Sequence, residues 1–174
     1  AKTISLHHGK HHQGYVAKTS ALVAGTPYQN MPLTDIIRAT HGVPDKAAIF
    51  NNAAQVFNHN AYWKSMKANG GGRPSGEVGR LVDGSFGGYE AFREQFLNAA
   101  QTQFGSGWAW LIVSGGKLAV CSTANQDNPI MGKAVAGCEG TPILGCDVSF
   151  DNGGLLDLEV LADLRRRYGP SSRP

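Results

Sequence analysis

Apolar residues recur at helical intervals through much of the first half of the chain. The segment 45–68 is rich in alanine, lacks glycine and proline, and begins with Asp45, a residue type that commonly caps a helix N-terminus. Nearer the start, His7, His11 and Tyr15 are spaced i, i+4 and i+8, which would stack them on one helix face. We therefore expect a helical first half, interrupted by a polar stretch over 25–34.

The pattern changes after the run NGGGRPSG at 69–76, because glycine and proline at this density interrupt regular structure. One more helix is predicted over 89–104, and short apolar or β-branched runs then follow. We predict strands over 108–114, 117–122 and 142–150, the first two joined by Gly115-Gly116 as a hairpin. The pattern predicts an α+β fold, with a helical domain over 1–72 and an α+β domain with a small three-stranded antiparallel sheet over 73–174.

Composition and charge narrow the range of partners. With 174 residues, 41% of them hydrophobic and 17% charged, the chain can form a packed core, and no apolar run approaches the twenty residues of a membrane span. Sixteen basic against thirteen acidic residues give a net charge of +3, too weak and dispersed for nucleic-acid binding. We expect neither nucleic acid nor a membrane as a partner, although this charge can help attract a small anion.

The cysteines bear on the cellular compartment. Cys121, Cys138 and Cys146 are odd in number and form no CxxC pair, so we expect no disulfide framework. The first residues, AKTISLHHGKHHQ, contain no apolar segment of the kind found in a secretory signal. Both observations favour a reduced, cytoplasmic setting.

Four of the six histidines lie in HHGKHH at 7–12, which raises the question of a metal site. Imidazole binds zinc, iron, manganese and copper, and an added carboxylate shifts the preference toward manganese and iron. The same residues also fit a solvated polar helix face, and His59 alone fits a hydrogen-bonded core histidine. Spacing by itself leaves both interpretations open.

Several long motifs together resemble the iron/manganese superoxide dismutase family. They are HHGKHHQGYV at 7–16, FNNAAQVFNHNAYW at 50–63, FGSGWAWL at 104–111, STANQDNP at 122–129 and TPILGCDV at 141–148. Their order and spacing also match, and the resemblance runs from about Ile4 to Val148. It implies an antioxidant oxidoreductase with a long N-terminal helical hairpin and one metal ion per chain. It also implies a homodimer and ping-pong conversion of superoxide to O2 and H2O2.

The resemblance assigns the site residues by position. His7, His59 and Asp147 correspond to metal ligands, and His11 and Tyr15 to residues that gate substrate access and take part in proton supply. Two neutral imidazoles and one carboxylate leave the ion with a positive charge. An aromatic wall is implied at Trp63, Trp108 and Trp110. Helical spacing alone would also fit Tyr15 and these tryptophans as core residues.

The identity of the metal depends on two glutamines. Iron-type family members carry a glutamine on the helix that hydrogen-bonds the solvent ligand of the metal, as Gln55 would here. Manganese-type members carry it in the sheet domain, where this chain has Gln126. We favour iron, with manganese as the alternative, because Gln55 shares a helical face with His59.

The sequence departs from the family after Asp147. The family pattern is roughly DVWEHAYY, whereas this chain reads DVSFDNGG, so that Asp151 stands where the family has its fourth ligand, a histidine. Every histidine of the chain precedes Asp147, and the Glu and Tyr that contribute to the family's dimer interface are absent. The alternative function is therefore an impaired or inactive member that serves as a metal-binding or structural module.

Overall fold

The computed structural model describes residues 2–66 and 72–148 of the chain. These residues divide into two compact units, the first ending at Asn60 and the second starting at Ala61. Among the helices described, none is long and apolar enough to cross a membrane.

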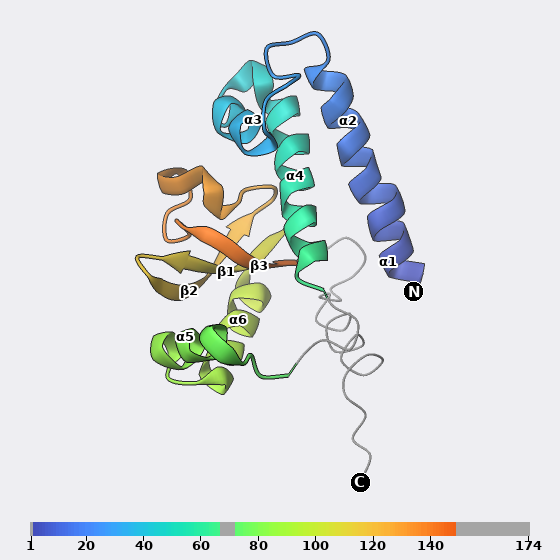
Figure 1. Ribbon diagram of the computed structural model, residues 1–174. Coiled ribbons are helices and arrows are strands. Elements are labelled where there is room, and N and C mark those ends of the chain that lie inside the picture. Colours follow the sequence, from blue (N-terminus) through green and yellow to red (C-terminus); the bar gives the residue numbers. More distant parts are fainter. Residues whose placement is uncertain (1, 67–71, 149–174) are drawn as a thin grey trace. The chain divides into compact units, whose positions relative to one another are not determined.

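The first unit begins with a long helical stretch that changes type twice (Figure 1). It runs without a break through α1 (Lys2–Leu6), η1 (His7–His12) and α2 (Gln13–Val23), and η1 is a π-helix. The junction residues Leu6 and His12 keep helical backbone angles, so the helix continues through the change. Gly25, with a φ of +71°, then lets the chain turn away from α2.

The remaining helices are α3 (Leu33–Thr40), the short 3-10 helix η2 (Pro44–Lys46) and α4 (Ala47–Lys64), of which residues 61–64 belong to the second unit. Figure 1 shows α2 and α4 side by side, and α4 returns antiparallel to the first stretch, so the expected helical hairpin is confirmed. Its buried apolar residues are Val23, Ile36, Ile37, Ile49, Phe50, Ala53, Ala54 and Val56.

Two details of this unit differ from the sequence-based predictions. Asp45 does not cap α4, because Pro44 starts a 3-10 turn in which the Asp45 carboxylate pairs with Lys46 at 2.8 Å. The polar stretch predicted over 25–34 ends earlier, because α3 already begins at Leu33, directly after Pro32.

The second unit contains two helices, three strands and a short 3-10 helix. In chain order they are α5 (Gly76–Phe86), α6 (Tyr89–Thr102), β1 (Gly107–Ser114), β2 (Lys117–Ala124), η3 (Pro129–Ala134) and β3 (Thr141–Asp147). The strands form an antiparallel sheet in the order β2-β1-β3, which confirms the predicted α+β class. Gly115 and Gly116, both with positive φ, form the hairpin turn as predicted. Helix α5 was not predicted.

The two faces of this sheet have different surroundings. On one face, Leu111 and Leu118 pack in a cluster with Val82 of α5 and Phe96 of α6. The opposite face carries Trp108, Trp110 and Ile112, which cluster with Tyr62 and Cys138 and are called the tryptophan face below. Because β1 is apolar on both sides, its sequence is a continuous apolar run rather than an alternating one.

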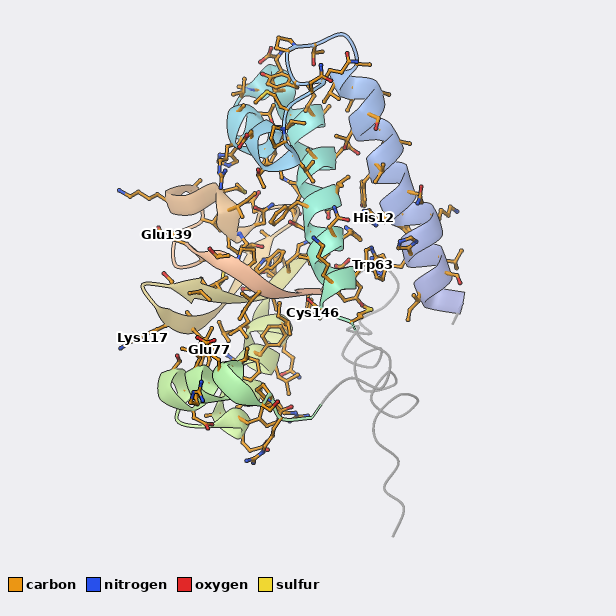
Figure 2. All side chains as sticks on the ribbon, in the orientation of Figure 1. His12, Trp63, Glu77, Lys117, Glu139 and Cys146 are labelled. Atoms are coloured by element: carbon orange, nitrogen blue, oxygen red, sulfur yellow. A yellow bond between two sulfur atoms is a disulfide. The ribbon has the colours of Figure 1, made fainter. Side chains whose placement is uncertain are left out.

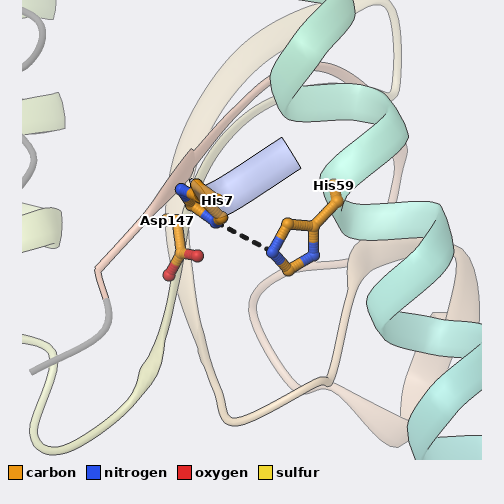
Figure 3. A group of neighbouring side chains, drawn as sticks. All are labelled: His7, His59 and Asp147. Atoms are coloured by element: carbon orange, nitrogen blue, oxygen red, sulfur yellow. Dashed lines mark hydrogen bonds between the residues drawn. The ribbon is translucent and has the colours of Figure 1, made fainter. Parts of the chain in front are cut away.

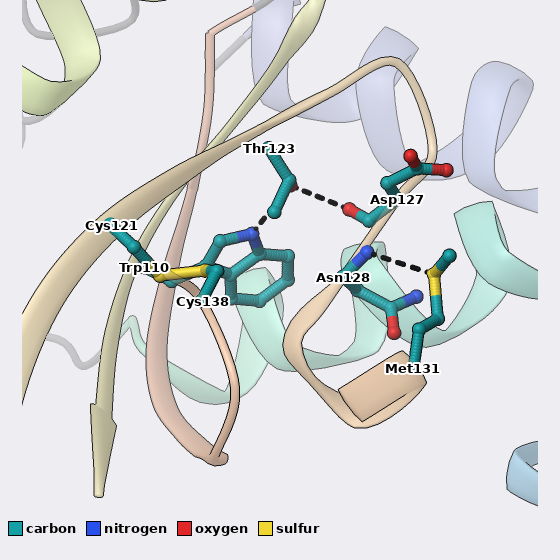
Figure 4. The surroundings of a disulfide bond; sticks show 7 residues. All are labelled: Trp110, Cys121, Thr123, Asp127, Asn128, Met131 and Cys138. Atoms are coloured by element: carbon teal, nitrogen blue, oxygen red, sulfur yellow. Dashed lines mark hydrogen bonds between the residues drawn. A yellow bond between two sulfur atoms is a disulfide. The ribbon is translucent and has the colours of Figure 1, made fainter. Parts of the chain in front are cut away.

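A disulfide joins Cys121 of β2 to Cys138, with the two Cα atoms 5.4 Å apart (Figure 4). The expectation that the three cysteines form no disulfide framework therefore missed this single bond. The partners are 17 residues apart, and only the fold, which returns the chain beside β2 after η3, brings them together. The number of cysteines therefore no longer supports a reducing compartment.

Candidate metal centre

Two imidazoles from opposite arms of the helical hairpin face each other. His7 lies at the start of η1 and His59 near the end of α4, and their Nε2 atoms are 3.0 Å apart (Figure 3). The rings meet edge to face, with centroids 4.9 Å apart. His59 is only 3% exposed. The hairpin therefore brings together two residues that are 52 positions apart in the sequence.

The tautomer of His59 follows from its second nitrogen. Nδ1 lies 2.8 Å from the backbone carbonyl oxygen of Gln55, one helical turn earlier on α4. A carbonyl oxygen can only accept, so Nδ1 carries the proton and donates it. Neutral His59 then has its lone pair on Nε2, the atom that faces His7.

This geometry fits a shared cation. Metal–imidazole bonds are about 2.1 Å long, so the nitrogens of two adjacent ligands lie about 3.0–3.4 Å apart for bond angles of roughly 90–110°. The 3.0 Å between the Nε2 atoms of His7 and His59, which is also a hydrogen-bonding distance, lies at the short end of this range. The pair therefore meets the requirements of two adjacent ligands of one metal ion.

The π-helix decides which histidine accompanies this pair. In a π-helix the hydrogen bonds run from residue i to i+5, and the wider turn leaves both i+4 and i+5 near the face of residue i. His12, five positions after His7, is only 7% exposed (Figure 2). Its ring stacks on that of His59, with centroids 5.6 Å apart and an angle of 22°. His11 is exposed and touches the His7 ring edge-on, with centroids 6.2 Å apart. Of the residues predicted to share one helix face, His11 contacts the ring of His7, and Tyr15 contacts the ring of His59.

Sequence reasoning missed His12, although HHGKHH offers a histidine at both i+4 and i+5 from His7. Burial lowers the pKa of His12 below its ordinary value, and the nearby imidazoles of His8 and His7 lower it further. A lowered pKa favours the neutral form of His12, which adds no positive charge beside a cation site.

Tyr15 and Gln55 complete the group in the first unit. The half-buried Tyr15 ring lies 5.3 Å from that of His59, as the predicted spacing from His7 requires. The Oε1 atom of Gln55 is buried and has no hydrogen-bond partner among the described residues. A buried amide oxygen without a partner is costly, and a bound water or hydroxide would satisfy it.

The second unit carries the predicted carboxylate. Asp147 is the last residue of β3, is 5% exposed, and pairs with Trp108 in the sheet, which puts its side chain on the tryptophan face. Its carboxylate offers one oxygen as a possible metal ligand. Trp63 is half-buried and packs against the same cluster as Trp108 and Trp110.

Two other residues of interest lie after the β1–β2 hairpin in the sequence. Gln126 is half-buried and follows Asn125, a non-glycine residue with a φ of +53°. Asp151 lies outside the described residues.

Comparison with known proteins identifies related sequences. The profile of the alpha-hairpin domain of iron/manganese superoxide dismutases matches residues 1–67, and the profile of their C-terminal domain matches residues 74–150. The chain is 49% identical over 131 residues to an iron superoxide dismutase of Leptolyngbya boryana, a match that covers 75% of this chain and 66% of that protein. It therefore spans just under two thirds of that relative's length.

Relatives with either metal in their names match at similar levels. A manganese superoxide dismutase of Pseudomonas aeruginosa is 46% identical over 151 residues, covering 85% of this chain and 71% of that protein. An iron superoxide dismutase of Escherichia coli is 44% identical over 149 residues, covering 85% and 72%.

Proposed function

Because the chain belongs to the iron/manganese superoxide dismutase family, we propose that it converts superoxide to O2 and H2O2 at one iron or manganese ion per chain. The observation that carries this proposal is the His7–His59 pair, whose Nε2 atoms lie 3.0 Å apart with the tautomer of His59 fixed by Gln55. The substrate is a small anion, which the net charge of +3 helps to attract.

We propose His7, His59 and Asp147 as the protein ligands. Two neutral imidazoles and one carboxylate suit iron and manganese better than softer metals. When bound, such an ion supplies the one-electron oxidation and reduction that superoxide conversion requires. The burial of His59 and Asp147 keeps bulk water away from these two donors.

The neighbouring residues hold the donors and handle protons. The Nδ1–H bond to Gln55 and the stacked His12 ring both restrict rotation of His59. Tyr15, half-buried against His59, is proposed to take part in proton supply through its hydroxyl group. His11 is exposed beside His7, which suits the proposed role at the entrance for the substrate.

Iron is the proposed metal. The buried Oε1 atom of Gln55 has no partner among the described residues, and Gln55 lies one turn from His59. A solvent ligand of the metal would satisfy this atom, as in the iron-type arrangement. Manganese remains the alternative, because Gln126 is also present and relatives of both kinds match.

Asp151 makes the degree of activity a separate question. The relatives reported above are superoxide dismutases, which supports an enzyme rather than an inactive module. However, an aspartate at the position of the fourth ligand either falls short of the metal or adds a second negative charge. We propose that turnover is lower than in an enzyme with histidine at this position.

We also propose that the protein is a homodimer in the cytoplasm. Phe104, between α6 and β1, is 97% exposed in the single chain, which is unusual for a large aromatic residue. Burial against a second copy would remove this apolar surface from water.

The proposal is tested by measuring metal content and superoxide consumption in the wild-type protein and in two variants. His59→Ala removes a proposed ligand, whereas His41→Ala removes a histidine that packs against Phe50 in the same unit. We expect His59→Ala to lose metal and activity together and His41→Ala to keep both. Stoichiometric metal without superoxide consumption in the wild type would indicate a metal-binding module instead. Full metal content in His59→Ala would refute the ligand assignment.

A further inference from the structure

The Cys121–Cys138 disulfide encloses residues 122–137, called the 122–137 loop below. This loop contains η3 and Gln126. Cys121 pairs with Trp110 between β2 and β1, and Cys138, which is 1% exposed, belongs to the cluster on the tryptophan face. The bond therefore fastens the loop to the sheet face that also carries Asp147.

The first half of the loop has additional attachments. The Thr123 hydroxyl accepts a hydrogen bond from Trp110 Nε1 at 2.9 Å and donates one to the Asp127 carbonyl at 2.6 Å (Figure 4). The backbone N–H of Asn125 donates to the Ser106 carbonyl at 2.8 Å. These bonds hold the backbone on both sides of Gln126.

The second half of the loop is attached differently. From 132 to 137 the residues are exposed or half-buried, and the backbone bonds of Val135 and Cys138 close turns within the segment itself. The packing of Val135 and the disulfide at Cys138 attach it to the sheet, and η3 contacts β3. The covalent bond thus fastens the C-terminal end of the loop.

We propose that Cys121 and Cys138 form a redox-responsive latch. With the disulfide formed, the 122–137 loop stays closed on the tryptophan face; with both thiols reduced, its second half opens. Closing a loop of this length by a disulfide shifts an opening equilibrium by roughly a hundredfold. The latch rests on the geometry of the second unit, whereas its effect on catalysis rests on the proposed function.

The chemistry requires a thiol as co-reactant. Two molecules of a small thiol such as glutathione give up two electrons and two protons and join as their own disulfide. The Cys121–Cys138 bond accepts these electrons and protons and becomes two thiols, and glutathione disulfide drives the reverse reaction. Disulfides in the proposed cytoplasmic setting are usually of this reversible kind.

Lys133 makes the opening measurable, because it is exposed and is the one trypsin site within residues 122–137. Trypsin cleavage of the full chain after Lys133 is followed by mass spectrometry in buffers of defined glutathione ratio. Cleavage after Lys117, at the end of the hairpin turn, serves as the internal reference. We expect cleavage after Lys133 to be at least tenfold faster in the reduced protein, and the oxidised protein to yield a cross-linked Cys121–Cys138 peptide.

Two variants separate the latch from general effects of reduction. The double variant Cys121→Ala/Cys138→Ala should be cut at the fast rate in every buffer. Cys146→Ala, which changes a buried cysteine outside the disulfide, should respond to glutathione like the wild type. The wild-type titration tests the proposal even if the double variant fails to fold.

Absence of the cross-linked peptide after oxidation, or equal cleavage rates in both redox states, overturns the latch. A double variant that folds and still responds to glutathione overturns it as well. Superoxide consumption measured in parallel separates the two proposals. An inactive protein with redox-dependent cleavage refutes the proposed function alone, and an active protein without it refutes the latch alone.

Discussion

Replacing Gly145 with alanine tests how the packing of the tryptophan face fixes the proposed carboxylate ligand. Gly145 lies on β3, two residues before Asp147, and pairs with Trp110 of β1. A Cβ atom at this position would lie 2.5 Å from Cζ3 and 2.9 Å from Cε3 of the Trp110 ring. Ordinary contacts begin near 3.4 Å, so the ring or the strand has to move by about 1 Å.

The strand has to move, because the Trp110 ring is held on several sides. It is fully buried, stacks on Trp108 at 5.6 Å, and donates its Nε1–H to Thr123. Overpacking of this kind destabilises a protein by about 1–3 kcal/mol. Since Asp147 follows on the same strand, its carboxylate shifts too, and a misplacement of about 1 Å at a reacting centre can reduce turnover by roughly 100-fold.

The assay combines urea unfolding with superoxide consumption per bound metal ion. Gly84→Ala is the matched control, since Gly84 lies within α5 of the same unit and a Cβ there would meet no atom within 4 Å. We expect this control to raise the free energy of unfolding by about 0.5–1 kcal/mol and to leave turnover unchanged. Wild-type stability and turnover in Gly145→Ala would refute the reasoning.

Two further predictions concern the position of the fourth ligand and the association state. Asp151→His should raise metal occupancy and turnover together, because it restores an imidazole where the family has one. Elemental analysis measures the metal occupancy and a superoxide assay measures the turnover; no gain in either quantity contradicts the prediction. Phe104→Lys should shift the dimer toward the monomer, since a charge would replace apolar surface at the proposed interface. Light scattering at micromolar concentration measures the molar mass, and a wild-type protein that is already monomeric contradicts the prediction.

The elements predicted correctly carried their own local signals. The β1–β2 hairpin followed from Gly115-Gly116 between two short apolar or β-branched runs, and α6 begins at Tyr89, where the predicted helix over 89–104 begins. Helix α5 was missed because its sequence contains several glycines, which lower helix propensity. Its apolar residues Val78, Leu81, Val82 and Phe86 nevertheless keep the i, i+3, i+4, i+8 spacing of a helix face.

The candidate site shows a different limit of sequence reasoning. The family motifs indicated His7 and His59 as metal ligands, and the helical hairpin places their Nε2 atoms 3.0 Å apart. The disulfide could not be found in the same way, because Cys121 and Cys138 meet through a return of the chain that no spacing rule describes.

The π-helix explains why His12 escaped notice. HHGKHH places a histidine both four and five residues after His7; an α-helix brings the i+4 residue back to the same face, whereas in the wider π-helix both i+4 and i+5 lie near it. The local sequence does not choose between these helix types, since they differ by about one residue per turn. The packing of the hairpin distinguishes them, because the His12 ring stacks on buried His59 and is itself buried, whereas His11 stays exposed. The helix type at this site is thus coupled to the contact between His12 and His59 of α4, two residues that are 47 positions apart in the sequence.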